Sequence, residues 1–365
     1  MKKIDWYIFK KLIITFFFCL LLFTIVAVAV DTSEKTDDFV RSGLSTSEII
    51  TEYFLGFVPF IWSLLFPLFV FIAVIFFTSK MATRSEIIAI LASGTSYRRF
   101  LRPYIIGGIM LSAILWVGSR YWIPKANAIR SNFQQNYIDN RDPSKNRTMG
   151  NCYECYYLRT DTNTFVGIKE FDTASKSSRG FFMEKVKDNK VVYNLRAERM
   201  RWDTAVKKWQ LINASERFID SMKERLSFHD TLVINLNIKI SELRKDNYLK
   251  DKLTTPELVE YINLQKLRGG EGLSTYEVEK HRRNATPTSV FLLTLIGVVI
   301  ASRKTRGGSG VHLALGITIA ALFIIADRFS TVFATKGNFP PMLAAWLPNI
   351  AFALVLLWLY RRTPK

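Results

Sequence analysis

Hydrophobic and polar positions divide the chain into three membrane-length apolar segments, a long mixed insert, and three further apolar segments. An α-helix needs about 20 apolar residues to cross a hydrocarbon core of roughly 30 Å. The fourth segment is shorter than this, although Thr286 and Arg303 can extend it at little cost. The pattern therefore predicts an α-helical membrane protein whose six spans are Leu12–Val30, Leu55–Thr78, Pro103–Ile123, Pro287–Ser302, Val311–Phe333 and Met342–Tyr360.

The loops between these segments differ in charge, and the difference predicts an orientation. Basic residues gather before the first segment, between the second and third, after the fourth and in the C-terminal tail, whereas residues 31–54 are mainly acidic. Short basic loops remain cytoplasmic. We therefore expect both termini inside and residues 124–285 outside. The first segment exceeds the about 7–15 apolar residues of a signal peptide, so we expect it to be retained.

The net charge of +19 would indicate nucleic-acid binding in a soluble protein. Here much of the charge lies in the short loops, and no nucleic-acid partner is expected. The insert is basic as well. That charge fits an acidic partner such as a phosphorylated lipid, and it fits an ordinary solvated domain equally well.

The insert begins with a region of short alternating stretches rich in strand formers. Turn signals at Asp161–Asn163, Asp188–Asn189 and Asn213–Ser215 separate them. Many short strands at regular intervals predict an antiparallel, jellyroll-like sandwich or open barrel. One face would form a core or line an apolar groove, and we expect Phe182 and Val192 to point inward. The expected strands lie at Tyr156–Leu158, Thr164–Ile168, Gly180–Met183, Val191–Tyr193, Trp209–Ile212 and Thr231–Ile234.

The pattern becomes helical towards the end of the insert. Thr254 and Thr255 precede Pro256 and Glu257, a combination typical of a helix start. Gly269 and Gly270 would end this helix. A second helix over Ser274–Ala285 would lead into the fourth span.

No sequence motif indicates catalysis. A Walker A motif is absent, as are HExxH, GxSxG and a dinucleotide fingerprint. Cys152 and Cys155 form a CxxC pair, which suits a redox site or two structural neighbours on a strand. With no second CxxC and three scattered histidines, no metal site is expected. A membrane-tethered thiol oxidoreductase that uses Cys152 and Cys155 remains an alternative function.

The expected cytoplasmic loop at residues 81–94 has the pattern of a short amphipathic helix. Thr83 or Ser85 could cap its N-terminus, and Gly94 could end it. Such a helix could dock into another protein or serve as a plain connector. Its apolar residues would be left at the surface unless something covers them: Ile87, Ile88, Ile90 and Leu91.

Several motifs, in order, resemble those of the lipopolysaccharide-export permeases of the LptF/LptG (YjgP/YjgQ) family. Arg84–Ala89 followed by Ala92–Ser96 is similar to the family's coupling segment, and Thr286–Pro287 to the start of its fourth span. Phe339–Asn349 resembles the last span of the LptG branch more than that of LptF. With the layout of three spans, insert and three spans, the resemblance covers essentially the whole chain.

The resemblance implies a permease subunit of an ABC-type exporter in the bacterial inner membrane. It would pair with a second homologous six-helix permease and a cytoplasmic ATPase dimer, and Mg-ATP would belong to that dimer. The subunit would extract lipopolysaccharide and pass it through a periplasmic β-jellyroll domain to a jellyroll bridge protein. The domains would be residues 1–123, 124–285 and 286–365. The coupling residues would be Arg84, Ser85, Glu86, Ile87, Ile88, Leu91 and Gly94. Another type of ABC permease, whose exported domain transmits force, remains an alternative.

The family also implies basic residues at the outer end of a lipid cavity. This chain departs from the family where Val30 and Asp31 end the first span, at a site where relatives can carry lysine. Charge-assisted hydrogen bonds favour Arg and Lys as phosphate ligands, although interfacial snorkelling gives the same pattern. The substitute candidates are Lys35, Arg120, Lys125 and Arg130.

Asp327 and Arg328 are ionisable residues inside the fifth span. Such residues at membrane depth are candidates for function. Adjacent residues do not share a helix face, so a bridge between them is not assured. Gating or lipid contact on one hand, and structural pairing on the other, both remain open.

Overall fold

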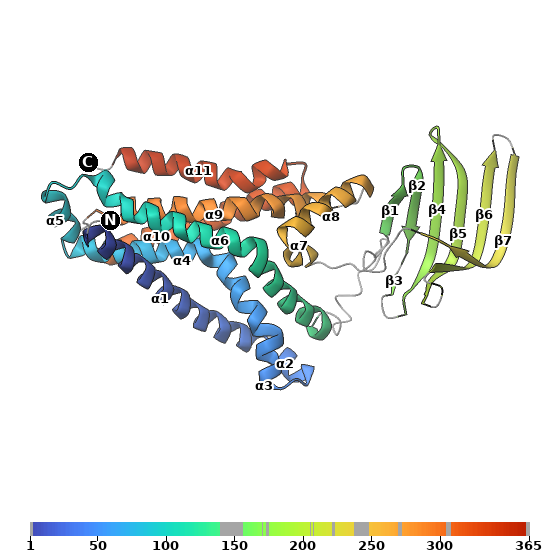
Figure 1. The fold of residues 1–365 in the computed structure, drawn as a ribbon, viewed down its shortest axis with the longest axis horizontal. Coiled ribbons are helices and arrows are strands. Elements are labelled where there is room, and N and C mark those ends of the chain that lie inside the picture. Colours follow the sequence, from blue (N-terminus) through green and yellow to red (C-terminus); the bar gives the residue numbers. More distant parts are fainter. Residues whose placement is uncertain are drawn as a thin grey trace. The chain divides into compact units, whose positions relative to one another are not determined.

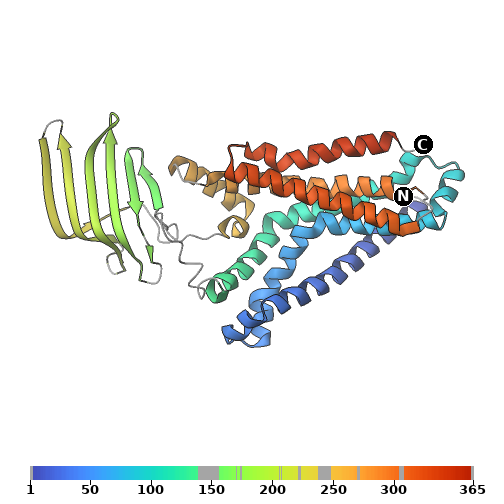
Figure 2. The same cartoon turned by 180° about the vertical axis from the view of Figure 1, so that it is seen from behind.

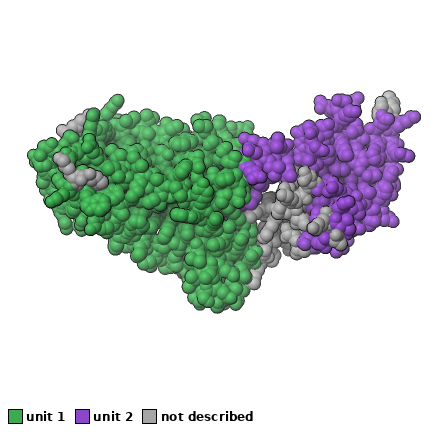
Figure 3. Space-filling view, viewed as in Figure 1, with its two compact units in different colours: residues 1–141, 250–259, 274–365 green, residues 142–249, 260–273 purple. Residues whose placement is uncertain are grey.

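The computed structural model describes residues 3–138, 156–169, 171–172, 175–204, 206, 208–220, 223–236, 248–268, 272–303 and 308–362. The chain forms two compact units (Figure 3). The first, helical unit comprises residues 1–141, 250–259 and 274–365, and the second comprises residues 142–249 and 260–273.

Six helices in the described residues are long and apolar enough to cross a membrane (Figure 1). This confirms the six predicted spans. Figure 2 shows both chain termini at one end of the helical unit, the end that also carries the short helix α5 (Glu86–Ala92). The long helices are α1 (Lys3–Glu34), α4 (Leu55–Thr83), α6 (Tyr97–Phe133), α9 (Leu273–Ala301), α10 (Gly308–Lys336) and α11 (Pro341–Arg361).

Two of these helices continue past the predicted segment ends. The expected helix at 274–285 and the short fourth span form one helix, α9, of 29 residues. Pro287 lies inside it and does not end it. Likewise α6 runs through residue 123 and Pro124 to Phe133. Residues 124–133 and 273–285, which the sequence pattern assigned to the insert, therefore belong to helices of the bundle.

Helix α4 contributes side chains to two apolar cores and is therefore the central helix of the bundle. Phe69 and Val70 pack with residues of α1 and α6, whereas Phe71 and Ile75 pack with residues of α9 and α10. Gly316 permits the close approach of α10, since a Cβ atom there would lie 2.2 Å from the Ile75 Cδ1 atom. Proline within α11 is compensated locally. Pro348 has no N–H for the Ala344 carbonyl, which instead accepts a 2.6 Å hydrogen bond from Ser330.

The other end of the bundle carries a cluster of aromatic side chains. It is built by α2 (Thr36–Ser42), α3 (Thr46–Ile49), η1 (Ile50–Phe54) and η2 (Gln134–Ile138) together with α4 and α6. Its buried members are Phe39, Tyr53, Phe57, Phe133 and Ile138. We call this the α7 end, after the short helix α7 (Leu249–Lys252), whose residue Asp251 is hydrogen-bonded to α6.

The second unit is built on one antiparallel sheet, in agreement with the predicted β domain. Its strands follow the order β1-β2-β4-β5-β6-β7, with the short β3 paired to β4 off this path, so apart from β3 the strands are neighbours in the sheet in their chain order. The strands are β1 (Tyr156–Asp161), β2 (Thr164–Ile168), β3 (Phe171–Asp172), β4 (Ser177–Lys187), β5 (Lys190–Asp203), β6 (Lys208–Asp220) and β7 (Lys223–Ile234).

Helix α8 (Thr255–Arg268) follows α7 in the chain, and it begins at the threonines that predicted a helix start.

Positive-φ residues in neighbouring strands change the side-chain alternation of the sheet. Glu198 of the central strand β5 lies between Gly180 of β4 (φ +94°) and Asn213 of β6 (φ +53°). The Asn213 amide donates a hydrogen bond to the Glu198 carboxylate at 2.7 Å. The turn expected at Asn213–Ser215 is therefore wrong, because these residues lie inside β6.

The apolar face of the sheet also differs from the expectation. Phe181 and Met183 are buried in its core, so Phe182 lies on the opposite face, where its ring packs 6.0 Å from that of Tyr157. The inward assignment of Phe182 is therefore wrong by one residue of register. Val192 lies at a register shift between β4 and β5, and it is not among the buried residues of the core. The core contains Val166, Ile168, Phe171, Phe181, Met183, Leu195, Ala197, Met200, Trp209, Leu211 and Ala214.

Candidate coupling and lipid-contact sites

Helix α5 begins without the predicted side-chain cap. Ser85 occupies the N-cap position with φ +60° and makes no capping hydrogen bond from its side chain. The Thr83 hydroxyl donates to the Ser79 carbonyl instead. The predicted end is confirmed: Gly94 has φ +82°, and its N–H donates to the Leu91 carbonyl at 3.1 Å.

Glu86, the first residue of α5, is held by the chain itself. The Tyr7 hydroxyl of α1 donates to its carboxylate at 3.3 Å, and Arg84 lies 4.0 Å away across an exposed ion pair. This position orients the first turn of α5 against α1. A substitution of Glu86 would therefore disturb an internal contact as well as any external one.

The two faces of α5 differ in burial. Ile87 is 2% exposed and lies in the core formed by α1, α4 and α6, with Ile90 and Leu91 half-buried beside it. Ile88 is 51% exposed, and Ala92 is exposed as well. The expectation of four uncovered apolar residues is thus corrected: the bundle covers one, half-covers two and leaves Ile88 at the surface.

Lys35 lies in the aromatic cluster at the α7 end. Its ammonium group donates to Asp31 at 2.7 Å and to the Tyr53 hydroxyl, and it lies over the Tyr53 ring, 4.8 Å from the centroid. Asp31 is 8% exposed, and its Oδ2 atom has no hydrogen-bond partner among the described residues. The charge of Lys35 is therefore already paired within the chain.

Two of the candidate arginines stack on aromatic rings. The Arg130 guanidinium lies 3.8 Å from the Phe60 ring centroid, and that of Arg120 lies 3.9 Å from the Trp116 centroid. Arg120 also donates to the Asn284 side chain at 3.4 Å. Such stacking buries part of each guanidinium while leaving charge available at the surface.

Lys125 is exposed, and its charge is one of the causes that lower the Glu257 pKa. The six lipid-contact candidates do not form one cluster. Lys35 and Arg130 share the aromatic cluster, whereas Arg120 contacts α9.

Asp327 pairs with Arg282 of α9 at 3.4 Å, not with its neighbour Arg328. Arg328 is exposed. The sequence did not predict Arg282 as the partner of Asp327, because no local pattern shows which residues of α9 and α10 lie side by side.

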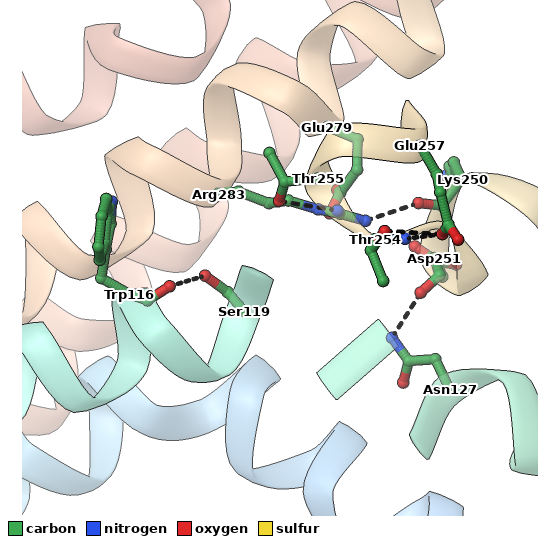
Figure 4. A network of polar contacts seen from close by, with 10 residues as sticks. All are labelled: Trp116, Ser119, Asn127, Lys250, Asp251, Thr254, Thr255, Glu257, Glu279 and Arg283. Carbon is green, nitrogen blue, oxygen red and sulfur yellow. Dashed lines mark hydrogen bonds and ion pairs between the residues drawn. The ribbon is translucent and has the colours of Figure 1, made fainter. Parts of the chain in front are cut away.

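A buried arginine joins α7, α8 and α9 (Figure 4). Arg283 is 5% exposed, and its guanidinium donates to three groups: Glu279 at 3.2 Å, the Thr255 hydroxyl at 3.2 Å and the Lys250 carbonyl at 3.0 Å. The Asn127 side chain of α6 donates to the Asp251 carbonyl at 3.1 Å. We call this group, residues 127, 250, 251, 255, 279 and 283, the α7 latch. Sequence reasoning missed Arg283, since it lies in a charged run typical of a solvated helix.

Asp251, within the latch, and Glu257, next to it, have pKa values shifted in opposite directions. Hydrogen bonds from the Thr254 side chain and N–H hold the pKa of Glu257 below its usual range. Burial, and secondarily the charge of Glu279, raise the pKa of Asp251. The ionised Glu257 carboxylate thus stabilises the start of α8. Ionisation of Asp251, by contrast, is disfavoured in the folded protein.

The apolar face of the sheet ends in a polar group. Glu216 accepts hydrogen bonds from the Tyr193 hydroxyl at 2.7 Å and lies 3.3 Å from the His229 Nε2 atom. Burial, followed by the hydrogen bond and charge of Glu216, raises the Tyr193 pKa. This arrangement keeps Tyr193 protonated as a donor.

Metal and redox chemistry receive no structural support within the described residues. No group of three or more His, Cys, Asp or Glu residues there could hold a metal ion. Cys152 and Cys155 lie outside the described residues, so the redox alternative stays a prediction. Cys19 is free and buried.

Comparison with known proteins identifies the family. Residues 6–362 match the family of the lipopolysaccharide export system permease LptF/LptG. The chain is 21% identical over 314 residues to the lipopolysaccharide export system permease protein LptG of Escherichia coli strain K12, covering 81% of both chains. LptG of Escherichia coli O6:H1 is matched over the same length at the same identity. With six long helices interrupted by a β domain, as the resemblance implied, the chain belongs to the LptF/LptG family of lipopolysaccharide export permeases.

Proposed function

We propose that the chain is a permease subunit of an ABC-type exporter that extracts lipopolysaccharide from the inner membrane and passes it to a periplasmic jellyroll bridge. Both termini and α5 face the cytoplasm, and the β domain is periplasmic. A second homologous permease completes the membrane part. A cytoplasmic ATPase dimer binds Mg-ATP, and this chain contributes no catalytic residue. The family match over nearly the whole chain supports this assignment.

The observation that carries the proposal is the two-faced burial of α5. Ile87 anchors the helix in the bundle while Ile88 remains half-exposed on the other side. A short helix seated this way transmits force, because a push on the exposed face reaches α1, α4 and α6 through the buried one. The exposed face of Arg84, Ile88 and Ala92 is the surface proposed for the ATPase groove.

Substitution of Ile88 by Lys tests the coupling site. The change leaves the buried face and the Glu86–Tyr7 contact intact but places a charge in the proposed interface, so the ATPase should be lost during purification. Ile50→Lys is the matched control, since Ile50 is also 51% exposed but lies in η1 at the α7 end. Retention of the ATPase by Ile88→Lys, at the level of Ile50→Lys, would disprove the site.

Site-specific photocrosslinking tests the proposed lipid path through the β domain. A photoreactive residue at Met183 lies on the apolar face, whereas one at Phe182 lies on the opposite face of the same strand. Adducts with lipopolysaccharide should form at residue 183 and not at 182, and only when ATP is supplied. Equal labelling at both, or at neither, would remove the β domain from the path.

A further inference from the structure

A cleft lies within the helical unit, between α4, α9, α10 and α11. Most of its wall is apolar, and all four helices contribute to it, with Leu64 and Leu68 from α4, Leu293 from α9, Phe323 from α10 and Pro348 from α11. A mostly apolar wall with a few polar groups is typical of ligand sites.

Charged residues line one part of the same cleft. Arg282 and Asp327 form their ion pair there, and Arg328 joins them in the lining. Arg328 makes no hydrogen bond or ion pair with the described residues. Two guanidinium groups against one carboxylate leave an uncompensated positive charge on a membrane-length helix. Such charge at membrane depth calls for an anionic counterpart.

A buried amide in the lining also lacks a partner. Asn349 is 5% exposed, and its amide nitrogen donates to the Ala285 carbonyl at 2.8 Å. Its Oδ1 atom is buried and has no hydrogen-bond partner among the described residues. Buried polar atoms are rarely left unpaired, so Asn349 adds an unsatisfied acceptor to the polar part of the lining.

We propose that this cleft binds a single anionic glycerophospholipid, with one acyl chain along the apolar wall and the phosphate at Arg328 and Arg282. A phosphate at Arg328 forms charge-assisted hydrogen bonds. The unpaired positive charge also favours a headgroup of net negative charge over one whose quaternary ammonium offsets the phosphate. The site does not depend on which lipid the protein transports.

Native mass spectrometry of the full-length chain, purified with its accompanying subunits, tests the site. After delipidation, the protein is titrated separately with phosphatidylglycerol, phosphatidylcholine and lipopolysaccharide. The intact chain should bind one phosphatidylglycerol per copy, and phosphatidylcholine about tenfold more weakly, because the quaternary ammonium of phosphatidylcholine offsets the phosphate charge and is repelled by Arg328. Equal binding of phosphatidylcholine would overturn the anionic headgroup. Displacement of phosphatidylglycerol by stoichiometric lipopolysaccharide would assign the cleft to that lipid instead.

Two substitutions and their controls locate the binding in the cleft. Arg328→Gln removes the unpaired charge, and Leu64→Trp narrows the apolar wall. Each should lower phosphatidylglycerol binding about tenfold. The controls are Lys336→Gln, on the same helix outside the lining, and Leu354→Trp, on an exposed face of α11. Variants that keep the parental thermal unfolding temperature are compared. Unchanged binding in both cleft variants would overturn the proposal.

Discussion

The two ends of the helical bundle differ in how their functional side chains are partnered. At the α7 end, Lys35 is paired with Asp31 and Tyr53, and the Arg283 guanidinium makes three hydrogen bonds to α7, α8 and its own helix. At the α5 end, Ile88 projects from a seven-residue helix, and the Arg84–Glu86 pair is exposed and 4.0 Å long.

This difference separates a surface that the chain completes from one that it leaves open. At the α7 end the Arg283 contacts are buried and the Lys35–Asp31 pair is partly buried, and both are hydrogen-bonded, so they contribute to the fold and are costly to remove. The apolar residue exposed on α5 contributes little to the fold, since its area is still in water. Substitutions at the two ends should therefore act on different properties: stability at one end, association at the other.

Loss of Arg283 should have the largest effect on stability. Arg283→Leu leaves Glu279, the Thr255 hydroxyl and the Lys250 carbonyl without their donor, at a cost of about 3–5 kcal/mol for a broken buried pair. Thermal unfolding in detergent should shift down by several degrees or more. Lys280→Leu, at a half-buried position of the same helix, should change stability by about 0.5 kcal/mol or less. Similar shifts for the two variants would refute the latch.

The Lys35–Asp31 pair should show coupling in a double-mutant cycle. Lys35→Met leaves a carboxylate that is 8% exposed without its partner, which should cost about 1–3 kcal/mol. Adding Asp31→Asn should recover part of this loss, because the uncompensated charge is then gone. Additive effects in thermal unfolding would mean that Lys35 is not held by Asp31 and is free for lipid contact.

Glu257 should contribute a smaller, pH-dependent amount. Its carboxylate accepts from the Thr254 N–H and hydroxyl at the start of α8. Loss of such a cap costs about 1 kcal/mol. The pKa of Glu257 is lowered in the fold, so this stability is present above the ordinary glutamate pKa and is lost as the pH falls through the folded value. The difference between the parent and Glu257→Gln should therefore vanish on acidification, as measured by unfolding at stepped pH.

Asp251 should show the smallest effect, and of opposite sign. Burial raises its pKa, so the folded protein binds this proton more tightly than the unfolded chain does. Stability is then fully present below the unfolded pKa and decreases as the pH rises towards the folded pKa. Asp251→Asn should be slightly more stable than the parent at neutral pH and equal to it in acid. A destabilised variant at pH 7 would assign the carboxylate a structural role.

Sequence patterns predicted the layout because membrane length and strand alternation are strong local signals. The six spans and the antiparallel β domain follow from them. The continuation of α9 through Pro287 was not predicted, since a charged helix outside the apolar stretch has the same pattern whether or not it joins the next span. The face assignment of Phe182 failed by one residue, because the positive-φ residue Gly180 shifts the alternation of β4 between the buried Ser178 and Phe181.

The sites were less predictable than the fold, for a physical reason. The end of α5 at Gly94 could be predicted from the sequence, because it depends only on the positive φ that this one glycine adopts. The burial of Ile87, the Arg282–Asp327 pair and the Arg283 contacts depend on which helices lie side by side. No local pattern carries that information.

Hydrogen–deuterium exchange, with and without the ATPase, tests the contrast between the two ends most directly. Amides of residues 86–92 should gain protection when the ATPase binds. Amides of residues 249–257 should be equally protected in both states, because the α7 latch is complete within the chain. Unchanged exchange in α5, or a gain at residues 249–257 as large as that in α5, would show that the two ends do not differ in this way.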